Sequence, residues 1–154
     1  MGNEFTELVD ANWERAVREA TERFSDIRHE LLSALHSENP EHRSAAVATL
    51  TEAKDIESRE LVRKLVDDPD AYVREEALEY LADYAVLDDV PLLFRALVEG
   101  PHFFLASCAL QRLCADDGDI IQDDDTPVVR EEAIARWREK LIGMKLLPLS
   151  ERRL

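Results

Sequence analysis

The sequence predicts an all-α protein, an α-solenoid of stacked antiparallel helix pairs with a capping helix at each end. The first observation is a recurring pair Ala-x-x-x-Leu, whose alanines are 31 and 32 residues apart, at Ala46/Leu50, Ala77/Leu81 and Ala109/Leu113. The second is an apolar series in the same phase, at Leu31/Leu35, Leu61/Leu65 and Leu93/Leu97. The third is a proline shortly after each member of that series, at Pro40, Pro69 and Pro101. Two amphipathic helices per unit of this length are typical of helical repeat proteins.

The clearest unit begins at Asp68 and contains two helices. A residue before proline is biased away from the helical conformation, and Pro69 and Asp70 are favourable first-turn residues, so a helix is predicted over residues 70–85. Val73, Ala77 and Leu81 follow the helical period and form its apolar stripe. A second helix is predicted over residues 89–99, after a cap formed by the aspartates 88–89.

The other helices are predicted by the same periodicity. One long helix over residues 4–24 forms the N-terminal cap, with Trp13 as its anchor in the core, and Ser25 or Asp26 caps the next helix, which runs to about residue 36. Further helices are predicted over residues 41–53, 57–67, 102–115 and 127–142. The last of these turns five residues inward, namely Val129, Ala133, Ile134, Trp137 and Leu141, and the apolar tail 144–149 docks on it.

These motifs resemble a known family of repeats. The segments DPDAYVREEALEYLA and LDDVPLLFRALVEGP are similar to short bacterial HEAT repeats, and the resemblance covers about residues 25–141. It implies an α-solenoid in which the first helix of each pair lies on the convex side and the second on the concave, binding side. The chain departs from the repeat at Ala106, because the equivalent position elsewhere holds Arg43, Arg74 and Arg130.

Length and composition narrow the class of protein. A chain of 154 residues is expected to form one domain over residues 1–154. No apolar run is long enough to cross a membrane, and the N-terminus lacks the basic and apolar regions of a secretory signal. Cys108 and Cys114 lie on different faces of one predicted helix, which is unfavourable for a disulfide and fits two reduced cysteines. We therefore expect a cytoplasmic protein without a cofactor or a metal, as a monomer or a weak oligomer.

The charge is strongly negative. There are 34 acidic and 19 basic residues, which give a formal net charge of −15. Binding to nucleic acid requires a basic surface, so direct nucleic-acid binding is disfavoured. A field of this sign instead attracts a basic protein partner over long distances.

The predicted concave groove supplies one set of candidate contacts. Polar side chains beside the apolar stripes of the second helices would line it, and the candidates are Arg28, Arg63, Lys64, Arg95 and Glu99. The alternative for the basic group Arg59, Arg63 and Lys64 is ion pairing with the acids of neighbouring helices at i±4. His29 and His36 lie seven residues apart on one predicted helix, but no third metal ligand accompanies them, so we expect both to face solvent.

The region around residues 103–125 supplies a second set. Of Phe103 and Phe104, one can enter the core, and the other either packs on the following loop or serves as an aromatic anchor for a partner, a role for which Phe103 is a candidate. Six aspartates in ten residues make that loop acidic, and it lacks the ligand order of an EF-hand. It is either a solvated loop held by Ile120 and Ile121 or a contact for a basic partner through Asp116, Asp117, Asp119, Asp123, Asp124 and Asp125.

No motif indicates catalysis. The chain has no glycine-rich phosphate loop, no zinc signature and no histidine placed beside a nucleophile. We therefore expect a non-catalytic protein-binding module. The favoured hypothesis is an acidic inhibitor of the immunity type, which blocks a basic toxin. The alternatives are a general HEAT-repeat scaffold or adaptor and, less favoured, a protein that handles a small molecule as the HEAT-like bilin lyases do.

Overall fold

The computed structural model describes residues 2–114 and 117–152, and within these ranges every regular element is a helix. The contacts divide the chain into two compact units, residues 1–81 and 82–154. The all-α class predicted from the repeats is confirmed. The single domain expected from the length stays a prediction.

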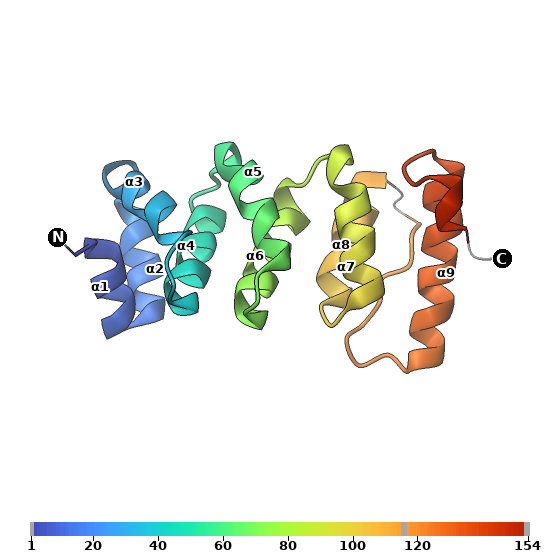
Figure 1. Cartoon of the computed structure of the whole chain (residues 1–154), viewed down its shortest axis with the longest axis horizontal. Coiled ribbons are helices and arrows are strands. Elements are labelled where there is room, and N and C mark those ends of the chain that lie inside the picture. The colour runs from blue at the N-terminus through green and yellow to red at the C-terminus, as the bar shows by residue number, and fades with distance from the viewer. Residues whose placement is uncertain (1, 115–116, 153–154) are drawn as a thin grey trace. The chain divides into compact units, whose positions relative to one another are not determined.

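The first unit is built from six helices. They are α1 (Glu4–Ala11), α2 (Trp13–Glu22), α3 (Phe24–Ala34), α4 (Pro40–Glu52), α5 (Arg59–Val62) and the greater part of α6 (Ala71–Tyr84). α2 packs on α4, and α1 packs on α2, α3 and α4 (Figure 1). α4 is the centre of this unit because seven consecutive residues, Ser44 to Leu50, are buried.

The N-terminal helix predicted over residues 4–24 is in fact two helices. Asn12 is extended, with φ −168° and ψ 111°, and it both ends α1 and caps α2. Its side-chain oxygen accepts the N–H of Arg15 at 2.8 Å, which satisfies one of the donors left free at a helix start. The break lets α1 fold back on α2, so two short helices replace one long cap.

Two other predictions for this unit are wrong. Ser25 and Asp26 do not cap α3, because α3 already begins at Phe24 and its N-cap residue is Arg23. The helix predicted over residues 57–67 is a succession of a 3₁₀ turn (Ile56–Ser58), the four-residue α5, and a second 3₁₀ turn (Arg63–Asp67). The burial pattern nevertheless survives, since Ser58, Val62 and Val66 are buried at intervals of four residues.

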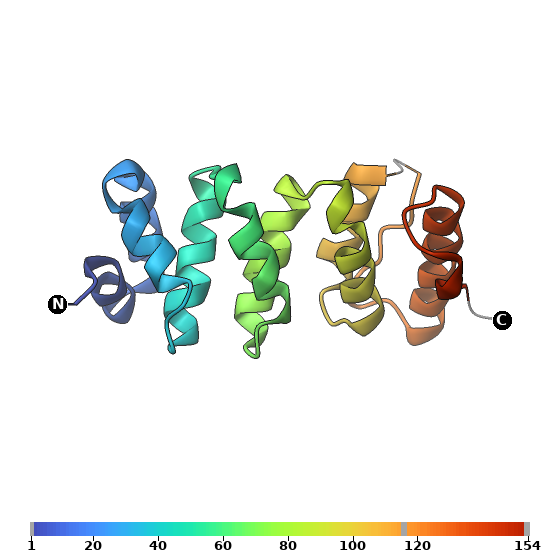
Figure 2. The same cartoon turned by 45° about the horizontal axis from the view of Figure 1, so that its top comes forward.

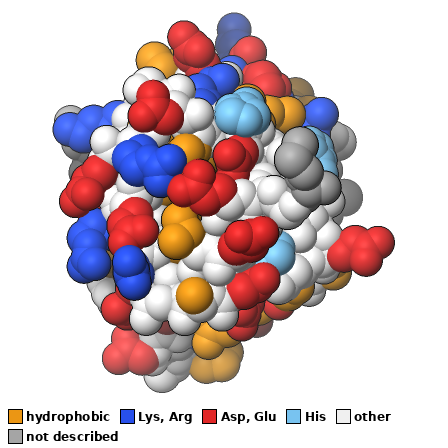
Figure 3. Space-filling view, turned by 90° about the vertical axis from the view of Figure 1, so that its left-hand side faces the viewer, with side chains coloured by type: hydrophobic (Ala, Val, Ile, Leu, Met, Phe, Trp, Pro, Cys, Tyr) orange, Lys and Arg blue, Asp and Glu red, His pale blue; other side chains and the backbone are white. Residues whose placement is uncertain are grey.

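The outer face of the first unit is polar. Viewed from the N-terminal end, it carries interspersed acidic and basic side chains with only small apolar areas between them (Figure 3). Capping repeats of helical arrays have a polar outer face of this kind. The helices α1 and α2 lie where the sequence predicted the N-terminal cap.

The arginine that recurs three positions before the repeat alanine holds the turn ahead of its helix. Arg43 donates to the carbonyls of Ser37 and Glu38 at 2.8 and 3.1 Å. Arg74 donates to those of Asp68 and Pro69 at 2.7 and 3.0 Å, and Arg130 to that of Asp125 at 2.9 Å. Each guanidinium thus satisfies carbonyl groups of a tight turn that has few other partners.

The second unit contains the end of α6 and the helices α7 (Val90–Glu99), α8 (Phe103–Cys114) and α9 (Pro127–Gly143). α7 packs on α8 and also contacts α9 (Figure 2). The turn between α7 and α8 requires glycine at position 100: its φ is +66°, and an added Cβ would lie 2.5 Å from the Phe103 ring. This turn belongs to the repeat in which Ala106 stands in place of the arginine, and here the Phe103 ring packs against Gly100.

The loop after α8 is held by side chains from both neighbouring helices. Ile121 is completely buried, as predicted, and its N–H donates to Ser107 Oγ at 3.0 Å. Trp137 of α9 is 1% exposed, and its Nε1 donates to the carbonyl of Asp119 at 2.7 Å.

Val129, predicted to point inward, is 46% exposed because it lies in the first turn of α9, beyond the core. In the tail, Leu147 is buried, whereas Met144 and Leu149 are exposed.

Candidate functional site

A groove of about 670 Å³ lies in the first unit, where the junction of α1 and α2 faces the first turns of α4 and α6. We name it the Trp13 groove. Its two aromatic residues are Trp13 and Tyr72. Four carboxylates and no Lys or Arg are among its lining residues, and the four acids are Asp10, Glu41, Asp70 and Glu76.

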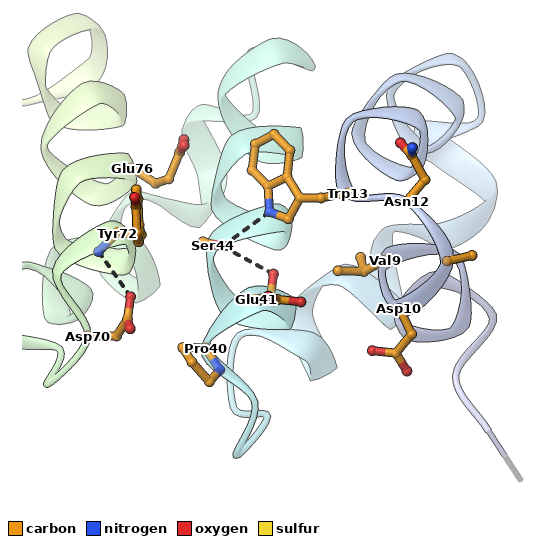
Figure 4. Close-up of a pocket in the computed structure, with 11 residues that line it drawn as sticks. Val9, Asp10, Asn12, Trp13, Pro40, Glu41, Ser44, Asp70, Tyr72 and Glu76 are labelled. Atoms are coloured by element: carbon orange, nitrogen blue, oxygen red, sulfur yellow. Dashed lines mark hydrogen bonds between the residues drawn. The ribbon is translucent and has the colours of Figure 1, made fainter.

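Trp13 and Tyr72 approach the groove from different helices. Trp13 comes from α2, and its Nε1 donates to Ser44 Oγ at 3.2 Å, which fixes the indole against α4 (Figure 4). Ser44 in turn donates to the carbonyl of Glu41 at 3.1 Å. Tyr72 comes from the first turn of α6 and is 74% exposed. Trp13 is thus half-buried and held in place, rather than being the core anchor that its sequence position predicted.

Local hydrogen bonds position two of the four acids. Asp70 caps α6, since its carboxylate accepts the N–H groups of Tyr72 and Val73 at 2.9 and 3.2 Å. The Asp10 carboxylate lies 2.6 Å from Nε2 of His42 on α4. Glu41 and Glu76 form no ion pair with any described residue. The groove therefore has two carboxyl groups without an ion-pair partner among the described residues.

Glu76 differs electrostatically from the other acids in the groove. Burial raises the pKa of Glu76 to about 7, and the negative charges of Glu79, Glu75 and Glu52 act in the same direction. The folded protein thus holds a proton on Glu76 at a pH where an exposed glutamate is ionised. A cation entering the groove would favour the ionised form.

We expect Glu76→Gln to stabilise the protein at alkaline pH. Because the folded-state pKa lies above the unfolded one, ionising Glu76 costs stability as pH rises from about 4.5 to 7, and the whole cost is present above 7. With an allowance for solvent screening, the variant should gain about 1–2 kcal/mol in the free energy of unfolding at pH 8 and almost nothing at pH 4.5. Urea denaturation at both pH values measures this.

The control for this experiment is Glu38→Gln, which removes an exposed acid on the same unit. Its stability should follow that of the unchanged protein at both pH values. An equal gain in Glu38→Gln at pH 8 would assign the effect to the net charge instead of the buried carboxylate.

A second, smaller groove of about 380 Å³ lies in the second unit, between α7, α9 and the C-terminal tail. Phe94, Val98 and Leu147 are among its apolar residues. The Arg138 guanidinium lies 5.3 Å from the centroid of the Phe94 ring, and its Nε is buried without a hydrogen-bond partner among the described residues. Two of the predicted contacts, Arg95 and Glu99, line this groove together with Arg138 and Glu151.

Three further residues were predicted to line the concave groove, and two of them, both arginines, have polar partners. Arg28 donates to Asp55 at 3.1 Å and to Ser58 at 3.2 Å, across to the segment before α5. Arg63 lies 3.5 Å from Glu60. Lys64 is exposed. Arg63 is thus ion-paired with an acid three residues earlier in its own segment, whereas the alternative placed the acids on neighbouring helices. Arg28 joins α3 to the 3₁₀ turn that begins after Asp55.

The predicted contacts around residues 103–125 have structural partners in most cases. Phe103 is 9% exposed, and the Arg130 guanidinium stacks 3.9 Å from its ring centroid, whereas Phe104 is 39% exposed. Arg136 binds both carboxylate oxygens of Asp119 at 3.0 Å, and Lys140 lies 2.8 Å from Asp117. The pairing with Lys140 lowers the pKa of Asp117.

Asp123 and Asp125 also have partners. Asp123 accepts the N–H of Phe104 at 3.1 Å, and Asp125 accepts that of Gln122 at 2.8 Å. Asp124 is exposed, and its carboxylate bonds to no described residue. Asp116 lies outside the described residues. The acids of this loop are thus largely used to hold it on α8 and α9.

Other candidate groups offer no reactive centre in the described ranges. His29 and His36 are exposed, as predicted. Cys108 and Cys114 are half-buried and unpaired, and burial raises the pKa of both thiols, which makes them weak nucleophiles. Residues 2–114 and 117–152 contain no group of three His, Cys, Asp or Glu side chains placed to hold a metal ion. No helix in these ranges is both long and apolar enough to cross a membrane.

The Trp13 groove was missed by the sequence analysis. Its two aromatic residues, Trp13 and Tyr72, lie 59 positions apart along the chain and meet because α2 and α6 both line the groove beside α4. One usable signal was present: Tyr72 lies off the apolar stripe of its helix, where an exposed aromatic residue needs another explanation.

Helix pairs, a regular apolar repeat and a recurring turn-holding arginine define a helical repeat protein. Residues 29–114 match the family model of HEAT repeats. Since this match covers more than half of the chain, the protein belongs to the HEAT repeat family, and the family predicted from the sequence is confirmed. None of the curated proteins or solved structures compared with the chain matches it. HEAT repeats commonly mediate protein–protein interactions and are typically non-catalytic.

Proposed function

We propose that this protein is a non-catalytic binding module for a basic protein partner and acts as an inhibitor of the immunity type. The observation that carries the proposal is the Trp13 groove, in which two aromatic residues and four carboxylates meet without a basic residue among the lining residues. Membership of the HEAT family supports the binding role. The net charge of −15 supports the sign of the partner.

Electrostatics gives this proposal a kinetic consequence. Opposite charge on two partners raises the rate of association, and salt removes most of that gain. An inhibitor that must capture a toxic partner quickly benefits from such steering. The many acids outside the groove contribute to the long-range field even where they are paired locally, because pairing with one arginine does not cancel the overall excess.

The second groove supports one alternative, a general adaptor. It combines apolar residues with two arginines and two glutamates, so it is suited to a partner of different chemistry from the one that fits the Trp13 groove. Two dissimilar binding surfaces on one chain are what an adaptor that holds two proteins together requires. An inhibitor needs only one.

The test is capture of partners by the purified protein from a lysate of its source cells, followed by measurement of the association rate. We expect one basic partner in a one-to-one complex, toxic when expressed alone, with an association rate about tenfold lower at 500 mM than at 50 mM salt. Several partners bound at micromolar strength would favour the adaptor. A partner that is not basic, or a rate indifferent to salt, would contradict the proposal.

A further inference from the structure

We propose that the Trp13 groove is the place where an arginine side chain of the basic partner inserts, between Trp13 and Tyr72. This rests on the proposed function and specifies the contact on which it depends. Nothing in the family resemblance assigns a role to this groove, which lies where α2 and the start of α6 face the first turns of α4.

The aromatic residues provide the walls of the site. A guanidinium group is planar and stacks on aromatic faces, where the ring quadrupole attracts its charge. The hydrogen bond from Trp13 Nε1 to Ser44 Oγ holds the indole in one orientation before any ligand arrives. Tyr72 is 74% exposed at the start of α6, and aromatic residues are enriched among those that carry the binding energy of interfaces.

The carboxylates provide the complementary charge. Glu76 points from α6 into the groove, and Glu41 lies on the first turn of α4 (Figure 4). Neither has an ion-pair partner among the described residues, although Glu76 is half-buried. An unpaired carboxylate in that position is costly, and the cost is removed when a guanidinium binds it. A second copy of this chain is a poor occupant, because two molecules of charge −15 repel each other.

The probe for the site is the blocked tripeptide glycyl-arginyl-glycine amide, titrated into the full chain. The two tryptophans give two indole N–H signals in an NMR spectrum, and Trp137 serves as the internal control because it is 1% exposed. We expect the Trp13 signal to shift and saturate with a dissociation constant on the order of 1 mM, while the Trp137 signal stays in place. The matched probe is the same peptide with citrulline, which keeps the shape and removes the charge.

The aromatic wall is tested with two variants at one position. Tyr72→Ala should weaken the arginine peptide about three- to fivefold, whereas Tyr72→Phe, which keeps the ring, should bind as well as the unchanged protein. The charge is tested with Glu76→Gln, for which we expect about fivefold weaker binding at pH 8. Glu38→Gln removes an equal charge from a site outside the groove and should leave the affinity unchanged.

The pH dependence of the peptide affinity tests the role of Glu76 independently. Ionised Glu76 binds the cation better, so the affinity should fall severalfold between pH 8 and pH 5.5 in the unchanged protein and much less in Glu76→Gln. The charged groups that face Glu76 are Glu75 and Glu79 on its own helix and Glu52 on α4. Asp10, Glu41 and His42 lie on the same groove or its rim and are common to both proteins, so the difference between the two profiles reports on Glu76.

Four results would overturn the groove proposal. They are equal binding of the citrulline peptide, equal loss of affinity in Glu38→Gln, a shift of the Trp137 signal alone, and a Trp13 signal that moves with protein concentration in the absence of peptide.

Failure of the proposed function would give a different set of results. If the peptide binds as expected but no basic protein is captured, the proposed function fails while the site stands. If a captured basic partner binds Tyr72→Ala and Glu76→Gln as tightly as the unchanged protein, the function stands and the groove proposal fails.

Discussion

Replacing Trp137 by alanine should lower the free energy of unfolding of the second unit by about 3–5 kcal/mol. The indole is 1% exposed, so its removal leaves a large cavity beneath the loop that precedes α9. The substitution also removes the hydrogen bond from Nε1 to the Asp119 carbonyl, 2.7 Å long. Urea denaturation followed by far-ultraviolet circular dichroism measures the loss, because every described regular element of this unit is helical.

Trp137→Phe separates the two contributions. Phenylalanine fills most of the cavity but cannot donate to the Asp119 carbonyl, so this variant should lose only about 1–2 kcal/mol. If the phenylalanine and alanine variants lost equal stability, the hydrogen bond rather than the packing would hold the loop. If neither lost stability, the loop would not depend on Trp137 at all.

Replacing Arg43 by methionine should cost the first unit about 3–5 kcal/mol, because it leaves a buried carboxylate without its partner. Arg43 donates to both oxygens of Asp68 at 2.9 and 2.8 Å, in addition to its bonds to the preceding turn. Methionine keeps an apolar stem in place of the arginine chain, so the loss reports on the charge and the hydrogen bonds. The control is Arg15→Met, which removes an exposed pair with Glu19 and should change stability by less than about 0.5 kcal/mol.

The Arg43→Met variant should also lose stability in acid less steeply than the unchanged protein. Burial acts to raise the pKa of Asp68, but the hydrogen bonds from Arg43 and from the N–H of Asp70 outweigh it, and the pKa is lowered. A folded-state pKa below the unfolded one contributes stability that is present above about pH 4 and is lost as pH falls further. Unfolding measured from pH 6 to pH 2 should therefore show a shallower acid loss in Arg43→Met. Parallel curves for the two proteins would contradict this assignment.

The sequence was sufficient to locate most of the helices. α4, α6, α7, α8 and α9 all lie within a few residues of their predicted ranges, because each carries an apolar stripe of helical period. For α4, α7 and α9 a proline in the first turn also marks the start of the helix. Periodicity failed at Asn12, where the apolar stripe continues across the break and only the capping side chain reveals it. It failed again over residues 57–67, since a 3₁₀ turn preserves the burial of Val62 and Val66 while changing the helix type.

The candidate site was harder to predict than the fold. Composition suggested that the aspartates after α8 are available to a partner, but the lysine and arginine that engage Asp117 and Asp119 lie on α9, 23 and 17 residues further along. Sequence spacing does not show such pairing between distant residues. Conversely, Glu76 resembles an ordinary helix-surface acid in the sequence, and its raised pKa comes first from its burial in the fold, with the charges of Glu79, Glu75 and Glu52 adding to it.

The turn-holding arginines have a consequence for how such a chain can change in length. Arg43, Arg74 and Arg130 each bond to a carbonyl only five or six residues earlier, so these arginine–carbonyl bonds are contained within one repeat, whereas the ion pair of Arg43 with Asp68 joins two successive repeats. A gene duplication that copies one repeat also copies its arginine and the carbonyls that the arginine binds, and a deletion removes the arginine and its turn together. Neither event leaves an arginine without its carbonyls or a turn without its arginine elsewhere in the chain. Arrays of this kind can therefore gain or lose repeats while each remaining turn keeps its arginine–carbonyl bonds.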